Sequence, residues 1–112
     1  ALRRASSRAL HLETSGVDGL SGDPDWVTLS PKSHRPPRQE LLRRCDELKV
    51  VIHTSDDLLF AESMAAAVRE PTVMLLQPGW DSPEGHQLAI DHVQCQPRWR
   101  LSLQTHKWLG VR

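Results

Sequence analysis

The sequence has few cysteines, because Cys45 and Cys95 are the only two among 112 residues, and they lie far apart. Neither belongs to a CxxC pair, so they predict no disulfide framework, no zinc site and no iron-sulfur site. We expect two reduced cysteines on helices, as is usual in a cytosolic protein.

An excess of one charge sign and a long apolar run are also missing. Lysine plus arginine equals aspartate plus glutamate at 14 each, so the balance does not support nucleic acid as the direct substrate. No apolar run approaches the roughly 20 residues of a membrane span, and the first residues lack the apolar segment of a signal peptide. We therefore expect a cytoplasmic protein with no membrane contact.

The length of 112 residues fits a single small domain, residues 1–112. The first residues, Ala-Leu-Arg-Arg-Ala-Ser-Ser-Arg, read like the end of a helix that began earlier. We expect a fragment that was cut between a helix and the strand after it.

The apolar patterns alternate between strands and helices. Strands are predicted at residues 9–13, 26–29, 48–53, 73–76 and 99–103, and the strand at 73–76 has the continuous apolar run of a strand buried on both faces. Helices are predicted at residues 39–46, after the cap Thr54 to about 69, and from the pair Ser82 and Pro83 to before Pro97. This order predicts an α/β fold, with a parallel β-sheet made of βα units and right-handed crossovers.

Polar or Gly/Pro residues follow four of the five predicted strands directly, at residues 13–16, 30–32, 77–80 and 104–107. In a parallel sheet these segments meet at the carboxyl edge, where ligands bind. We therefore predict one concave site that all four segments line. The alternative for any single segment is that strand ends meet water and are polar for that reason.

Two single residues stand out in these segments. Lys32 follows Pro31 directly, and this rigid turn would aim its ammonium group at an anionic ligand, although a lone lysine is often a solvated surface charge. Packing explains most of the four tryptophans, whereas Trp80 is a candidate stacking surface for an adenine ring.

Several segments resemble 7-carboxy-7-deazaguanine synthases, which are radical S-adenosylmethionine (radical SAM) enzymes of the queuosine and deazapurine pathway. The resemblance covers nearly the whole chain in the order of the family. Its segments are residues 11–16 (HLETSG), 26–32 (WVTLSPK), 47–52 (ELKVVI), 76–78 (LQP), 88–90 (LAI) and 98–109, which contain RLSLQTHKWL.

The resemblance implies the carboxyl-terminal half of a partial (β/α) barrel. The family converts 6-carboxy-5,6,7,8-tetrahydropterin to 7-carboxy-7-deazaguanine with loss of ammonia, in a tRNA modification pathway. The resemblance places S-adenosylmethionine at Ser30, Pro31, Lys32, Gln77, Pro78, Gly79 and Trp80. For the substrate we expect Arg112, through the terminal carboxylate, and also Glu13, Thr14, Gln104, His106 and Lys107.

The chain departs from the family at two places. Gly79 and Trp80 replace a different pair in many relatives, and the tail ends in Gly110, Val111 and Arg112. His106 and Lys107 have simpler explanations, because a histidine can cap the strand edge and a lysine can pair with a nearby carboxylate.

The cofactors of the family need ligands that this chain does not carry. A [4Fe-4S] cluster needs three cysteines, so its ligands and those of Mg²⁺ are expected upstream, and the chain alone is expected to be inactive. The family also implies an electron donor such as flavodoxin and a homodimer. Two alternatives stay open: a non-catalytic remnant or interaction module, and another radical SAM enzyme with a different substrate.

Overall fold

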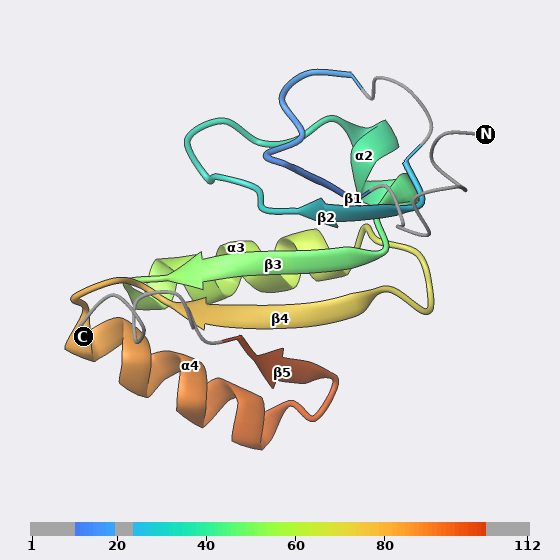
Figure 1. Cartoon of the computed structure of the whole chain (residues 1–112). Coiled ribbons are helices and arrows are strands. Elements are labelled where there is room, and N and C mark those ends of the chain that lie inside the picture. Colours follow the sequence, from blue (N-terminus) through green and yellow to red (C-terminus); the bar gives the residue numbers. More distant parts are fainter. Residues whose placement is uncertain (1–10, 20–23, 103–112) are drawn as a thin grey trace, which may run out of the picture.

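In the part of the chain that the structure describes, five parallel strands form one sheet in the order of the chain (Figure 1). The computed structural model describes residues 11–19 and 24–102. The strands are β1 (His11–Thr14), β2 (Trp26–Leu29), β3 (Glu47–Ile52), β4 (Val73–Pro78) and β5 (Trp99–Leu101). All four neighbouring pairs are parallel, which confirms the predicted α/β fold with a parallel sheet.

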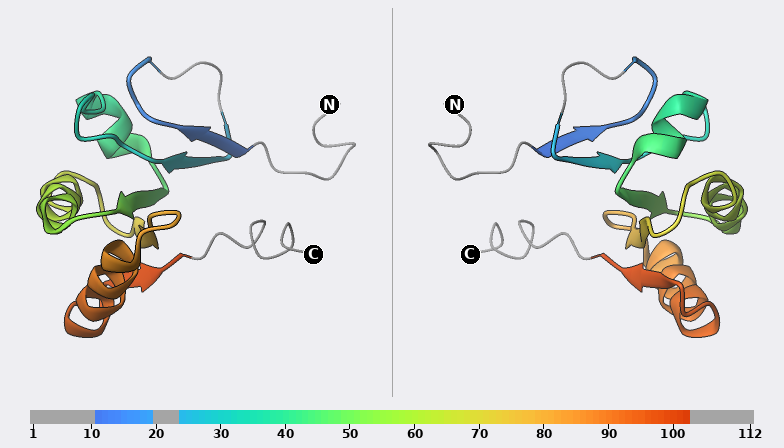
Figure 2. Two further views of the ribbon diagram at one scale, coloured as in Figure 1. Left: turned by 90° about the vertical axis from the view of Figure 1, so that its left-hand side faces the viewer. Right: turned by 90° about the vertical axis from the view of Figure 1, so that its right-hand side faces the viewer.

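Within the described residues, three helices connect the strands, and Figure 2 shows them on one side of the sheet. They are α2 (Gln39–Arg44), α3 (Ser55–Ala65) and α4 (Pro83–Cys95). Helix α2 packs on β2, α3 packs on β3, and α4 packs mainly on β4 and β5. No helix within the described residues has the length and apolar composition that a membrane crossing needs.

The predicted helix starts are confirmed by their caps. Thr54 and Asp57 form a capping box at α3, and the Ser82 hydroxyl accepts a hydrogen bond from the Gly85 N–H at α4 (3.1 Å). The predicted end of α3 near residue 69 is wrong, because turns after Ala65 carry Arg69 to Asp46 instead.

The core lies between the helices and one face of the sheet. Alternating strand residues point to this face and are almost fully buried, among them Val27, Leu29, Leu48, Val50, Ile52, Leu76 and Trp99. Each such side chain contributes about 1.5–3 kcal/mol through its burial. On the other face no described helix covers the strands, and Leu75 is only half-buried. The prediction that 73–76 is buried on both faces is therefore wrong within the described part of the chain.

A polar network fastens the amino ends of the strands, opposite the predicted site. The Asp46 carboxylate accepts a hydrogen bond from the Val27 N–H (2.9 Å) and pairs with Arg44 (2.9 Å) and Arg69 (2.8 Å). Burial would raise the pKa of Asp46, but the Val27 N–H and the two guanidinium groups lower it overall.

We expect Asp46→Asn to lower the free energy of unfolding by about 1–2 kcal/mol at neutral pH. Because the folded-state pKa is lowered, the stabilisation is present above the ordinary aspartate pKa and is lost as the pH falls through the folded-state value. Urea denaturation at several pH values should show the difference from the wild type shrinking in acid. The exposed Asp18→Asn is the control, and a difference that stays constant with pH would contradict the assignment.

Candidate functional site

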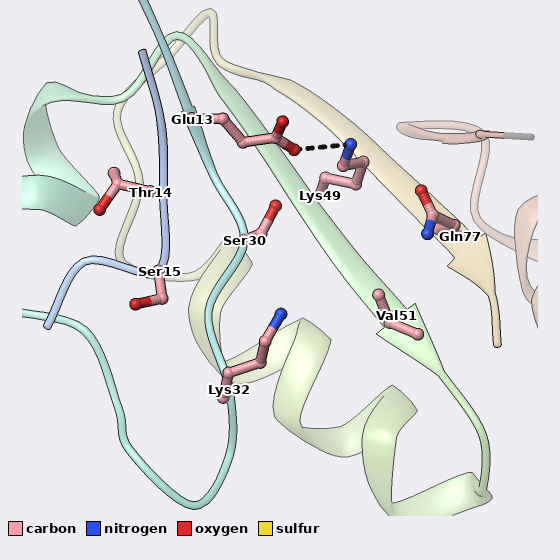
Figure 3. Close-up of a pocket in the computed structure, with 8 residues that line it drawn as sticks. All are labelled: Glu13, Thr14, Ser15, Ser30, Lys32, Lys49, Val51 and Gln77. Carbon is pink, nitrogen blue, oxygen red and sulfur yellow. Dashed lines mark ion pairs between the residues drawn. The ribbon is translucent and has the colours of Figure 1, made fainter. Parts of the chain in front are cut away.

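A cavity of about 310 Å³ lies near the carboxyl edge of the sheet. The strand-end segments after β1 and β2 contribute most of its lining, and β3 and β4 contribute the rest. Its residues are Glu13, Thr14, Ser15, Ser30, Lys32, Lys49, Val51 and Gln77 (Figure 3).

Backbone hydrogen bonds hold the two strand-end segments together. The Ser30 N–H donates to the Thr14 carbonyl (2.8 Å), and the Arg38 N–H donates to the Gly16 carbonyl (2.8 Å). Gly16 has a φ of +82°, and a Cβ there would crowd Pro37 and the Leu29 side chain, so only glycine fits this turn without strain. Residues 13–16 and 30–32 therefore form one rigid corner of the cavity.

An ion pair crosses the cavity between two strands that are not neighbours. The Lys49 ammonium on β3 lies 2.9 Å from the Glu13 carboxylate on β1, and Figure 3 shows the two side chains pointing toward each other. The hydrogen bond from Lys49 is the main reason why the pKa of Glu13 lies below its ordinary value, although partial burial opposes it.

Ser30 and Lys32 add hydrogen-bond donors on the same side. Figure 3 shows both side chains pointing toward the space beside Glu13 and Lys49. The Ser30 Oγ is buried and has no hydrogen-bond partner among the described residues. Gln77 is only 8% exposed although its side chain is polar. Buried polar groups are normally paired, so the unpaired Ser30 Oγ indicates a ligand that supplies the missing partner.

The residues that line the cavity therefore combine two ammonium groups, three hydroxyls and an amide with one carboxylate. Such a set suits a ligand that carries both a carboxylate and hydrogen-bond donors or a positive charge. Thr14 differs from its neighbours, because its Oγ1 accepts a hydrogen bond from the Gly16 N–H (3.0 Å) and points away from Glu13 in Figure 3.

The structure brings together some of the predicted site residues and not others. Five of them line the cavity: Glu13, Thr14, Ser30, Lys32 and Gln77. Four others do not line it: Pro31, Pro78, Gly79 and Trp80. Pro31 is buried, Gly79 packs against the His53 ring, and Trp80 is 62% exposed. Gln104, His106, Lys107 and Arg112 lie outside the described residues.

Lys49 and Val51 also line the cavity, from β3, and the strand-end pattern did not predict them. Both sit within the strand and not after it, so a search limited to strand ends passes over them. A signal was present in the sequence, because Lys49 interrupts an apolar strand. Side chains alternate along a strand, so Lys49 lies on the same sheet face as Glu47, which pairs in register with Thr28.

Comparison with known proteins identifies relatives over almost the whole chain. A 7-carboxy-7-deazaguanine synthase from Prochlorococcus marinus is 52% identical over 91% of this chain and 52% of its own length. The chain is a homologue of the 7-carboxy-7-deazaguanine synthases. A synthase of that name from Flavobacterium psychrophilum is 39% identical over 96% of this chain and 52% of its own length.

The fold agrees with this homology. The crystal structure of QueE from Escherichia coli superposes with a TM-score of 0.79 at 26% identity, and the match covers 92% of this chain and 48% of that one. No protein-family model matches the chain. The chain spans about half the length of the relatives that it matches, which is consistent with the carboxyl-terminal half of a 7-carboxy-7-deazaguanine synthase.

Proposed function

We propose that the full-length protein is a 7-carboxy-7-deazaguanine synthase, a radical SAM lyase that converts 6-carboxy-5,6,7,8-tetrahydropterin to 7-carboxy-7-deazaguanine and ammonia. The homology to synthases of that name supports the proposal. The observation that carries it is the shared cavity, because residues after β1 and β2 and at the end of β4 meet there. This chain would supply one half of the partial barrel.

The residues of the cavity fit S-adenosylmethionine. Ser30, Lys32 and Gln77 would hold it, since all three line the cavity and the Ser30 Oγ has no partner among the described residues. When bound at a reduced [4Fe-4S] cluster, S-adenosylmethionine supplies the radical that removes a hydrogen atom from the substrate. The part of this chain is to orient the ligands and to exclude water from them.

On the substrate side, the Glu13 carboxylate would accept hydrogen bonds from N–H groups of the pterin. Gln104, His106, Lys107 and the carboxylate of Arg112 would complete the substrate contacts, as the family resemblance implies.

The cysteines of this chain do not fit the [4Fe-4S] cluster. The chain has two where three are needed. Cys45 is buried, and burial raises the pKa of its thiol to about 11, which disfavours the thiolate that binds iron. Within residues 11–19 and 24–102 no group of three His, Cys, Asp or Glu side chains is arranged to hold a metal ion. We therefore propose that the other half of the protein binds the cluster and Mg²⁺. A homodimer, an electron donor such as flavodoxin and a cytoplasmic location belong to the same proposal.

The activity is tested with the full-length protein, reconstituted with iron and sulfide and supplied with a reductant. We expect it to form 7-carboxy-7-deazaguanine from 6-carboxy-5,6,7,8-tetrahydropterin, together with 5′-deoxyadenosine. An intact cluster that cleaves S-adenosylmethionine without this product would indicate another radical SAM substrate. A full-length sequence without the three cluster cysteines would indicate a non-catalytic remnant.

We expect Lys32→Ala to weaken S-adenosylmethionine binding by about 10-fold, because one charge-assisted contact at the cavity is lost. Equilibrium binding to the reconstituted protein measures this change. Arg35→Ala is the matched control, since Arg35 is an exposed cation of the same loop that does not line the cavity. Equal losses in the two variants would show that only the overall charge of the loop matters.

A further inference from the structure

Lys49 occupies an unusual position for a charged side chain, within the central strand of the sheet. Because side chains alternate along a strand, Lys49 points away from the core face of Leu48 and Val50, toward the face that Figure 2 shows without helices. Its side chain is 24% exposed. In the described part of the chain, its ion-pair partner is Glu13, which reaches over β2 from the edge strand β1. The Lys49 ammonium group therefore faces the cavity and pairs with Glu13, which also lines the cavity.

The pair between Lys49 and Glu13 is easy to exchange. The Glu13 side chain is 57% exposed, and ion pairs with a partner this exposed contribute little to stability. A ligand carboxylate that enters the cavity can replace Glu13 at Lys49, and Glu13 then regains contact with water or with donor groups of the ligand. The half-buried ammonium keeps an anionic partner throughout the exchange, so no unpaired buried charge arises.

Ser30 stands beside Lys49 in the sheet register. Leu29 pairs with Leu48, and Ser30 and Lys49 are the residues that follow each of them. The buried Ser30 Oγ has no partner among the described residues, so its hydroxyl proton is available for a second acceptor atom. A carboxylate has two oxygens, and the ammonium and the hydroxyl together match them.

We propose that Lys49, together with Ser30, anchors a ligand carboxylate by taking it in place of Glu13. This inference deepens the proposed function and rests on it. The proposed reaction has two ligands with a carboxylate: the amino-acid part of S-adenosylmethionine and the 6-carboxylate of the tetrahydropterin. The shared chemistry is the carboxylate, and the test separates the two sources.

The test measures equilibrium binding of two ligand pairs to the reconstituted full-length protein. One pair is S-adenosylmethionine and its decarboxylated form, and the other is 6-carboxytetrahydropterin and tetrahydropterin. The variants are Lys49→Ala and Lys49→Arg. Arg43→Ala is the control, because it removes an exposed positive charge from α2, on the opposite side of the sheet.

We expect Lys49→Ala to weaken binding of one carboxylated ligand by roughly 10- to 100-fold. Lys49→Ala should bind the analogue without the carboxylate within about 3-fold of the wild type, because the substitution removes only a charge contact to the carboxylate. Lys49→Arg and Arg43→Ala should bind all four ligands within about 3-fold of the wild type. The ligand pair that shows the difference identifies the carboxylate that Lys49 binds. If circular dichroism shows that Lys49→Ala does not fold, Lys49→Gln provides the same comparison with a longer side chain.

Equal weakening of a ligand and of its analogue would overturn the inference, since that result indicates a structural role for Lys49. Unchanged binding of both carboxylated ligands would overturn it as well. Failure of the proposed function is a separate result, in which the wild-type protein binds S-adenosylmethionine but forms no 7-carboxy-7-deazaguanine. In that case the S-adenosylmethionine pair still tests Lys49.

Discussion

Replacement of Trp99 by alanine is expected to lower the free energy of unfolding by about 3–5 kcal/mol. Trp99 is 1% exposed and joins the core from β5. Its indole Nε1–H donates a hydrogen bond to the Glu62 carboxylate of α3 (2.8 Å). The substitution therefore removes the largest fully buried side chain among the described residues and one partner of a half-buried carboxylate.

Glu62 connects three elements at this corner of the molecule. It pairs with His92 of α4 (2.7 Å) and with Arg98 before β5, in addition to Trp99. Burial would raise the pKa of Glu62, but the hydrogen bonds from His92 and Trp99 and the charge of Arg98 lower it overall. Loss of Trp99 thus loosens the packing of α3 and α4 against the last strand before the tail.

Urea denaturation followed by circular dichroism measures the loss. Trp80→Ala is the matched control, because Trp80 is 62% exposed and exposed substitutions usually change stability by about 0.5 kcal/mol or less. Similar losses in the two variants would contradict the placement of Trp99 in the core.

Substitution of Gly85 by alanine is expected to destabilise the fold by about 1–3 kcal/mol, as overpacking does. Helix propensity alone favours alanine over glycine by about 1 kcal/mol within a helix. Propensity would therefore predict that Gly85→Ala stabilises the protein, whereas we expect it to destabilise the protein. The reason is contact: a Cβ on Gly85 would fall on the backbone carbonyl oxygen of Ile52. That oxygen also accepts a hydrogen bond from the Gly79 N–H (2.8 Å), so it cannot move freely.

The strain from Gly85→Ala should also reach the segment that follows β4. Moving α4 away from β3 would displace the segment after β4, because the Gly79 N–H donates a hydrogen bond to the Ile52 carbonyl. Gly19→Ala is the control, because a Cβ on Gly19 meets no atom within 4 Å. The measurement is again urea denaturation. A Gly85→Ala protein more stable than the wild type would show that α4 does not pack this closely on β3.

Local signals in the sequence were sufficient to predict most of the fold. The strand at 26–29 was predicted with its observed bounds, and the caps at Thr54 and Ser82 mark the observed starts of α3 and α4. The end of α3 at Ala65 was not predicted, because residues 66–70 contain no glycine or proline that would mark it.

The candidate site was predicted only in part. Ser30 and Gln77 could be predicted from their positions at strand ends, because a parallel sheet brings such positions to one edge. Lys49 was missed although it interrupts an apolar strand, because its place at the cavity also depends on which sheet face the helices leave open and on Glu13 reaching over β2. Strand ends alone did not show that Pro78, Gly79 and Trp80 lie outside the cavity lining, with Gly79 against the His53 ring and Trp80 exposed.

The most direct test of the account is a crystal structure of the full-length protein with S-adenosylmethionine and 6-carboxytetrahydropterin bound. The expected result is S-adenosylmethionine within hydrogen-bond distance of Ser30 and Lys32, and the pterin next to it in the cavity between Glu13 and Gln77. Ligands bound elsewhere, with the Ser30 hydroxyl and the Gln77 amide contacting neither of them, would contradict the claim that the strand ends of this chain build the binding site.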